Sequence, residues 1–135
     1  MYTTSGNRAI VWVFVVIVIL VNAAGYALNL YDRFGWFDEV IHTYTSFTLT
    51  LLLALLLYGD VLSGVRRSPI LLVLTVASLG IAIGALWEIA EWGYDQMVPE
   101  NAILGKTDTI IDLILDSLGA LAAGIVGIVM IKPGS

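Results

Sequence analysis

The fold is decided by the stretch Leu86-Trp87-Glu88-Ile89-Ala90-Glu91-Trp92, which leads to Asp108-Thr109-Ile110-Ile111-Asp112-Leu113-Ile114-Leu115-Asp116. In the first part, Glu88, Glu91 and Asp95 are spaced so that a helix places all three on one face. In the second part an aspartate recurs every four residues, so the three aspartates line one stripe of a helix. The neighbouring residues are apolar enough for a membrane, where ionisable groups are costly and usually functional.

The composition supports the membrane interpretation. Hydrophobic residues make up 59% of the 135 residues and charged residues only 13%, which is outside the range of soluble domains. We therefore expect one all-α integral membrane domain covering residues 1–135. The absence of cysteine excludes disulfides and thiolate metal sites. With six basic residues against eleven acidic ones, the chain lacks the positive charge that binding to a nucleic acid requires.

Four apolar segments have the length that a bilayer requires, roughly 20 residues each. Their boundaries are about 9–30, 37–58, 69–97 and 108–131. Ser68-Pro69 is a good pair for the start of the third helix, since serine caps helices and proline favours the first position. Because the connecting loops are short, we expect an antiparallel four-helix bundle.

The basic residues predict the orientation of this bundle. Arg8, Arg66, Arg67 and Lys132 fall on one side, and Arg33 and Lys106 fall on the other. Lysine and arginine concentrate on the cytoplasmic side, so we expect both termini in the cytoplasm. The acidic residues then lie toward the extracytoplasmic end of a multi-pass protein in the cytoplasmic membrane.

Small residues recur at helical spacing on the third and fourth segments: Gly80 and Gly84, then Gly119, Ala123 and Gly127. Such residues let membrane helices approach closely. We expect this packing within one chain, with a homodimer face as the alternative.

Depth along each helix, at about 1.5 Å per residue, separates two sets of polar residues. The deep set is predicted to bind metal and consists of His42, Glu88, Glu91, Asp112 and Asp116. A second set is predicted at the mouth of the site or around the ligands: Asp38, Asp95, Asp108 and Asn29. Arg33 and Lys106 are the candidates for contact with an anion.

The deep carboxylates require compensation. Each charge at the middle of a membrane helix costs roughly 2.5–3.5 kcal/mol, so four cost on the order of 10 kcal/mol before repulsion. A bound metal ion, shared protons or a cationic substrate would each offset this cost. Carboxylates with one imidazole suit Mg²⁺, Mn²⁺, Ca²⁺, Fe²⁺ or Zn²⁺, and the oxygens suffice for one or two ions.

Several of these residues resemble a known family pattern. Trp87-Glu88, Glu91, Asp95-Gln96, Asp108, Asp112 and Asp116 before Leu118-Gly119-Ala120 resemble the YjdF-like and VanZ-like families of small bacterial membrane proteins. Phe37-Asp38 with His42 fits the YjdF-like pattern better, and Lys106 and Asp116 depart from the VanZ-like one. The resemblance implies a protein with several membrane spans and does not imply a reaction.

Three functions follow as hypotheses. The first is a metal-dependent enzyme, a hydrolase or transferase, acting on a lipid phosphate or head group, with membrane lipid as the partner. The second is a protein that binds or transports a cation or proton. The third is an accessory subunit of a larger membrane complex, in which a partner satisfies the acids.

Overall fold

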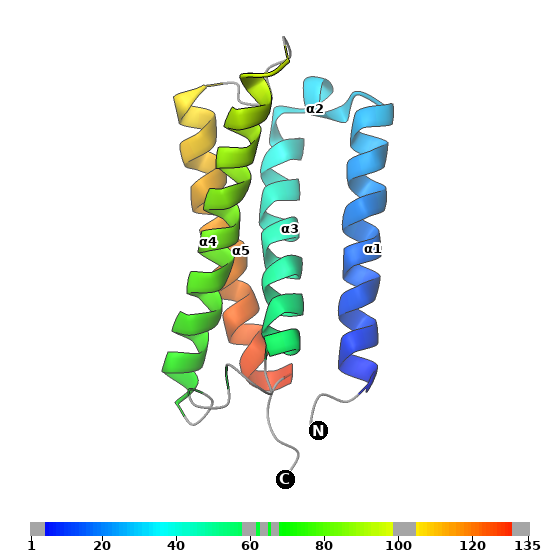
Figure 1. The fold of residues 1–135 in the computed structure, drawn as a ribbon. Helices are drawn as coiled ribbons and strands as arrows, with labels where there is room; N and C mark the ends of the chain where they lie inside the picture. Colours follow the sequence, from blue (N-terminus) through cyan, green and yellow to red (C-terminus); the bar gives the residue numbers. More distant parts are fainter. Residues whose placement is uncertain (1–4, 58–61, 63–64, 66–67, 99–104, 131–135) are drawn as a thin grey trace.

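The computed structural model describes residues 5–57, 62, 65, 68–98 and 105–130. The described residues form helices and contain no strand, and four helices are long and apolar enough to span a membrane. They are α1 (Ser5–Ala27), α3 (Gly35–Leu57), α4 (Pro69–Asp95) and α5 (Lys106–Met130), which stand side by side in Figure 1. The predicted all-helical fold with four candidate membrane spans is therefore confirmed. Arg66, Arg67, Lys132 and the predicted helix ends at 58 and 131 lie outside the described residues.

The helix boundaries follow local sequence signals. Ser68 has an extended backbone and its Oγ accepts a hydrogen bond from the Leu71 amide at 3.4 Å, while Pro69 occupies the first turn of α4. The first helix ends at Ala27, three residues earlier than predicted, because Asn29 adopts a left-handed conformation with φ of 53°. A short helix, α2 (Leu30–Arg33), which the sequence did not predict, then leads into α3.

The connection from α1 to α3 is fixed by an aromatic and polar contact. The Tyr31 hydroxyl donates to Asn22 Oδ1 at 2.8 Å, and its ring meets Phe37 edge-on with centroids 4.9 Å apart. Asn22 Nδ2 in turn donates to the Val18 carbonyl. Burial, with Tyr26 and Asp38 nearby, raises the pKa of Tyr31 to about 12, which keeps the hydroxyl protonated as a donor.

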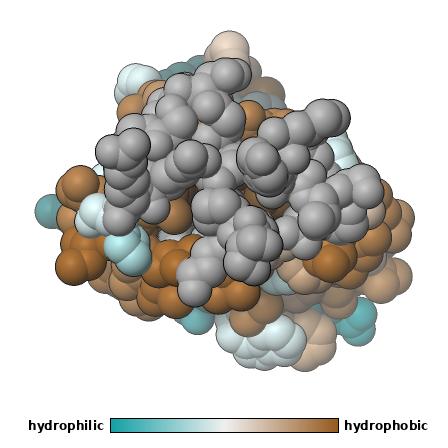
Figure 2. Space-filling view, turned by 90° about the horizontal axis from the view of Figure 1, so that it is seen from below, coloured by the Kyte–Doolittle hydropathy of each residue, from teal (hydrophilic) through white to brown (hydrophobic). Residues whose placement is uncertain are grey.

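An apolar core lies where the end of α3, the start of α4 and the end of α5 meet. Its buried members include Leu51, Leu55, Leu72, Val76 and Ala123. The outer surface is also apolar, since each of the four long helices exposes large hydrophobic side chains. Figure 2, which looks along the bundle, shows hydrophobic residues around much of the visible rim. This surface is typical of a protein surrounded by lipid.

Small residues allow α3, α4 and α5 to approach closely. A Cβ on Gly80 would collide with Thr50 and Ala120, and one on Gly119 would collide with the Thr43 carbonyl. On Gly124 it would lie 3.0 Å from the Val73 carbonyl oxygen. These contacts show that the glycines pack within the chain, as the spacing predicted.

Candidate metal centre at the carboxylate end of the bundle

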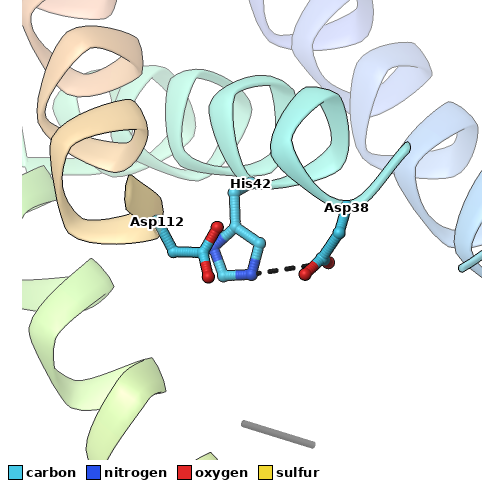
Figure 3. A group of neighbouring side chains, drawn as sticks. All are labelled: Asp38, His42 and Asp112. Carbon is cyan, nitrogen blue, oxygen red and sulfur yellow. Dashed lines mark ion pairs between the residues drawn. The ribbon is translucent and has the colours of Figure 1, made fainter. Parts of the chain in front are cut away.

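His42 lies at the centre of a polar cluster in the first turns of α3. Only 8% of the residue is exposed, and its Nε2 atom lies 3.7 Å from Oδ1 of Asp38, one helical turn earlier. Asp112 reaches the same imidazole from α5, so that the ring lies between two carboxylates (Figure 3). The i, i+4 relation of Asp38 and His42 therefore places both on one face of α3.

The other ring nitrogen of His42 faces two more carboxylates. Nδ1 lies 3.5 Å from Oδ1 of Asp116 on α5 and 4.0 Å from Oε1 of Glu88 on α4. Glu88 is 5% exposed and Asp116 4% exposed. Three helices therefore bring one imidazole and four carboxylates together inside the bundle.

The ligand atoms fall into two sets that share His42: Asp38, His42 and Asp112, and then His42, Glu88 and Asp116. Within each set the atoms lie within 4.8 Å of one another, close enough to surround one ion. A neutral imidazole has one nitrogen with a free lone pair, which can bind a metal or accept a hydrogen bond, and one nitrogen that carries a proton. His42 can therefore ligate an ion through one nitrogen only, while the other nitrogen carries a proton and faces a carboxylate.

Glu88 distinguishes the two sets. Both of its carboxylate oxygens are buried, and within the described residues neither accepts a hydrogen bond of good geometry, although the Thr109 side chain lies near them. A buried, unpaired carboxylate costs several kcal/mol unless a cation or proton compensates it. All three residues of the set formed by His42, Glu88 and Asp116 are thus buried, and the Glu88 carboxylate has unfilled bonding capacity.

Backbone packing holds Asp116 in this position. An ideal Cβ on Gly84 would lie 2.5 Å from Oδ2 of Asp116, so only glycine leaves room for the carboxylate against α4. Ser46 Oγ on α3 donates to the Asp116 backbone carbonyl at 2.8 Å. Ser46 was not predicted, although it lies four residues after His42 and this spacing is the signal that identifies it. Gly84 was predicted as a packing residue, and its contact with a candidate ligand is an additional role.

The remaining predicted residues lie around this cluster. Glu91 belongs to neither set, and its Oε1 accepts a hydrogen bond of 2.8 Å from Trp87 Nε1 on the same helix. Asp95 and Asp108 are partly buried at the last and first turns of α4 and α5. Asn29 is exposed at the turn before α2 and belongs to neither set.

The two candidate anion contacts differ in position. Arg33 is exposed at the end of α2. Lys106 begins α5 and lines a groove of about 510 Å³ between α4 and α5. Glu88 and Thr109 line the same groove, which otherwise has apolar walls, including Trp92 and Leu113. Thr109 was not predicted as a site residue. Its position one turn before Asp112, toward the start of α5, is the pattern that identifies it.

Comparison with known proteins gives a family but no reaction. An uncharacterized protein of Thermotoga maritima is 35% identical over 108 residues, which cover 76% of this chain and 53% of the relative. The chain thus spans about half the length of the curated relative that it matches. No solved structure matches. Neither match supports the VanZ-like part of the sequence prediction. The family described as predicted membrane protein (DUF2238) matches residues 4–133, and the chain belongs to this family.

Proposed function

We propose that this membrane protein binds a divalent metal ion through His42, Glu88 and Asp116 and uses it on the phosphate head group of a membrane lipid. The observation that carries the proposal is the buried carboxylate of Glu88, whose oxygens accept no hydrogen bond of good geometry in the described structure. A cation at this point would face Nδ1 of His42 and one oxygen from each carboxylate. Imidazole and carboxylate ligands suit Mn²⁺, Fe²⁺ and Zn²⁺, with Mg²⁺ and Ca²⁺ favoured less by the nitrogen.

The second set of carboxylates would support the first. With Nδ1 turned toward the ion, Nε2 of His42 would carry the proton and face Oδ1 of Asp38, 3.7 Å away. A carboxylate behind a metal-bound histidine fixes the orientation of the ring. Asp112 belongs with Asp38 and His42 to the second set and is the candidate to accept a proton during the reaction. A divalent ion would polarise a phosphate oxygen and activate water.

The proposal includes the orientation and family resemblance predicted from sequence. The antiparallel bundle would have both termini in the cytoplasm of a bacterial cell, so the cluster would open toward the outer leaflet. Lys106 and Arg33 would then lie at the level of the lipid phosphates. The YjdF-like assignment is also part of the proposal, because the description of the matching family says only that its members are predicted membrane proteins.

Elemental analysis of the purified protein tests this function. We expect about one Mn²⁺, Fe²⁺ or Zn²⁺ per chain, and metal-stimulated release of phosphate from phosphatidic acid or a polyprenyl phosphate. The Asp112→Asn variant should keep the metal and lose turnover, since Asp112 is outside the proposed ligand set. Protein without metal, and without turnover of either lipid after incubation with each ion, would contradict the proposal.

A second candidate function, a pathway for protons or cations, is favoured by a different observation. Thr48 and Thr50 are buried on α3, and their hydroxyls have no hydrogen-bond partner among the described residues. Thr50 lies about 12 Å beyond His42 along the helix, toward the apolar end. Buried hydroxyls of this kind would extend a polar route from the cluster. Ion flux into liposomes that is lost in both Asp112→Asn and Thr50→Val would favour this function over the first.

A further inference from the structure

The groove between α4 and α5 has the dimensions and lining of a lipid site. It measures about 510 Å³, and Ile89, Trp92 and Leu113 give it apolar walls. Both helices have the length and hydropathy of membrane spans, so the groove faces the hydrocarbon region when the protein is in a bilayer. The molecules available to fill an apolar groove at this depth are the acyl chains of lipids.

The polar residues of the groove are arranged by depth. Lys106 is exposed at the first residue of α5, and Glu88 is buried about seven residues, or about 10 Å, before the end of α4. Lysine at the end of a membrane helix extends its ammonium group toward the head-group layer. The groove therefore has a cation at its outer end and opens inward onto a carboxylate of the metal cluster.

This charge arrangement selects one class of lipid. A phosphate beside Lys106 gains an ion pair, whereas a phosphate beside Glu88 is repelled unless a cation neutralises the cluster. We propose that the α4–α5 groove binds an anionic phospholipid, with an acyl chain against the apolar wall and its phosphate between Lys106 and the metal cluster. This proposal rests on the proposed function for the role of the ion. It adds the groove through which an anionic phospholipid would reach the ion.

A consequence is that the ion and the lipid strengthen each other's binding. The ion removes the repulsion between the cluster and the phosphate, so the affinity for anionic lipid rises when the cluster is loaded. Linkage requires that anionic lipid raises the affinity for the ion by the same factor. A zwitterionic lipid, whose head group carries its own cation, should show a weaker effect.

Photolabelling in nanodiscs tests the site. The probe is phosphatidylglycerol with a diazirine on its acyl chain, diluted into phosphatidylcholine, and mass spectrometry locates the labelled residues. We expect label on Ile89, Trp92 and Leu113. Lys106→Gln should reduce it about fivefold, which corresponds to the loss of one lysine contact with an anionic lipid. Arg33→Gln removes an exposed cation outside the groove and should reduce the labelling of these three residues less than Lys106→Gln does.

A second pair of variants tests the groove without changing charge. Ala85→Trp fills the groove and should abolish the label there, whereas Ile125→Trp, on the exposed surface of α5 away from the groove, should not. Label spread evenly over α1, α4 and α5, or equal labelling by a phosphatidylcholine probe, would overturn the proposal. Cross-links to a second copy of the chain at these residues would also overturn it.

Metal content measured on the same samples separates this inference from the proposed function. Bound metal with no selective label in the groove would contradict the lipid route and leave the metal site standing. Selective labelling that Lys106→Gln removes, in protein that binds no divalent ion, would support the groove and contradict the metal function. With both present, chelation by EDTA should lower the labelling by phosphatidylglycerol in the wild type.

Discussion

The two ends of the bundle bury opposite kinds of side chain between the same three helices. Where the start of α3, the end of α4 and the start of α5 meet, the interior holds His42, Glu88, Asp112 and Asp116. At the other end of these helices the interior holds an apolar cluster, with Leu51, Leu55, Leu72, Val76 and Ala123. Each end is well buried, so the contrast concerns charge rather than packing.

This contrast assigns different tasks to the two ends. Close packing of apolar side chains stabilises the association of membrane helices, as do glycines such as Gly80 and Gly124 that let the backbones approach. Carboxylates buried beside one imidazole repel each other and oppose folding until a cation or protons compensate them. We infer that the apolar end holds the helices in place while the carboxylate end retains an unfavourable charge cluster for binding.

The largest expected effect comes from neutralising Glu88. Glu88→Gln keeps the shape of the side chain but removes a charged ligand, so we expect Mn²⁺ affinity to fall by more than about 100-fold. Residues that contact a ligand without binding the metal typically cost less than this when they are replaced. The metal-free variant should also unfold at a higher temperature than the wild type, because one of the buried carboxylates that repel each other around His42 loses its charge. Mn²⁺ titration followed by electron paramagnetic resonance and thermal unfolding in detergent measure the two effects.

Leu51→Ala at the apolar end is the matched control for this variant. Leu51 is completely buried, and its truncation should destabilise the protein by roughly 2–5 kcal/mol with little change in Mn²⁺ affinity. The two variants thus predict opposite shifts in unfolding temperature. If Glu88→Gln lowers the unfolding temperature of metal-free protein as much as Leu51→Ala does, Glu88 stabilises the fold and the contrast between the ends is wrong.

A smaller effect is expected at Asp38, which would orient His42 without binding the ion. Asp38→Asn should weaken Mn²⁺ binding by about 10–100-fold, the range for carboxylates behind metal-bound histidines. Asp116→Asn, which removes a proposed ligand on the other side of the ring, should weaken it more. The reverse order would place the ion at Nε2 of His42, with Asp38 and Asp112 as its ligands.

Glycine substitutions on the close-packed faces compare the two ends directly. A Cβ on Gly84 meets the Asp116 side chain, whereas a Cβ on Gly124 meets the backbone of Val73. Gly84→Ala should therefore displace a ligand and lower Mn²⁺ affinity about tenfold, at the low end of the effects of disturbed ligand support. Gly124→Ala should lower the unfolding temperature and leave the affinity unchanged. Equal effects of both variants on affinity would mean that the ends are mechanically coupled.

The apolar end was the easier part to predict from sequence. Length and hydropathy of the four segments identified the membrane helices, because a bilayer demands both in every spanning segment. The exceptions are local. The first helix ends early at Asn29, whose left-handed backbone starts the turn to α2, and four residues are too few for a periodic hydrophobic pattern to reveal a helix.

The carboxylate end was predictable as a region but not as a set of contacts. Periodicity placed Glu88, Glu91 and Asp95 on one side of a helix. The side chains on such a face still point in directions that differ by tens of degrees around the helix axis. Rotation of α4 against α5 decides which of them enters the bundle, and that rotation depends on Gly84 fitting against Asp116. Helical spacing alone does not contain this information.

Glu91 provides the smallest expected effect and the sharpest test of that rotation. It was predicted as a ligand together with Glu88, but its Oε1 accepts a hydrogen bond from Trp87, whose side chain is exposed on the outer surface of α4. Glu91→Gln keeps the accepting oxygen, so we expect Mn²⁺ affinity to change by less than about twofold, as for other substitutions away from a site.

Trp87→Phe completes this test, because it removes the hydrogen-bond donor and leaves the Glu91 carboxylate free to turn. Should the ion use only the buried set, Trp87→Phe will bind Mn²⁺ as the wild type does. A loss in Glu91→Gln close to that in Glu88→Gln would show that metal binding turns α4 or the Glu91 side chain inward. The ligand set would then include both glutamates, as their spacing first indicated, and the metal-free arrangement of α4 would be one of two states.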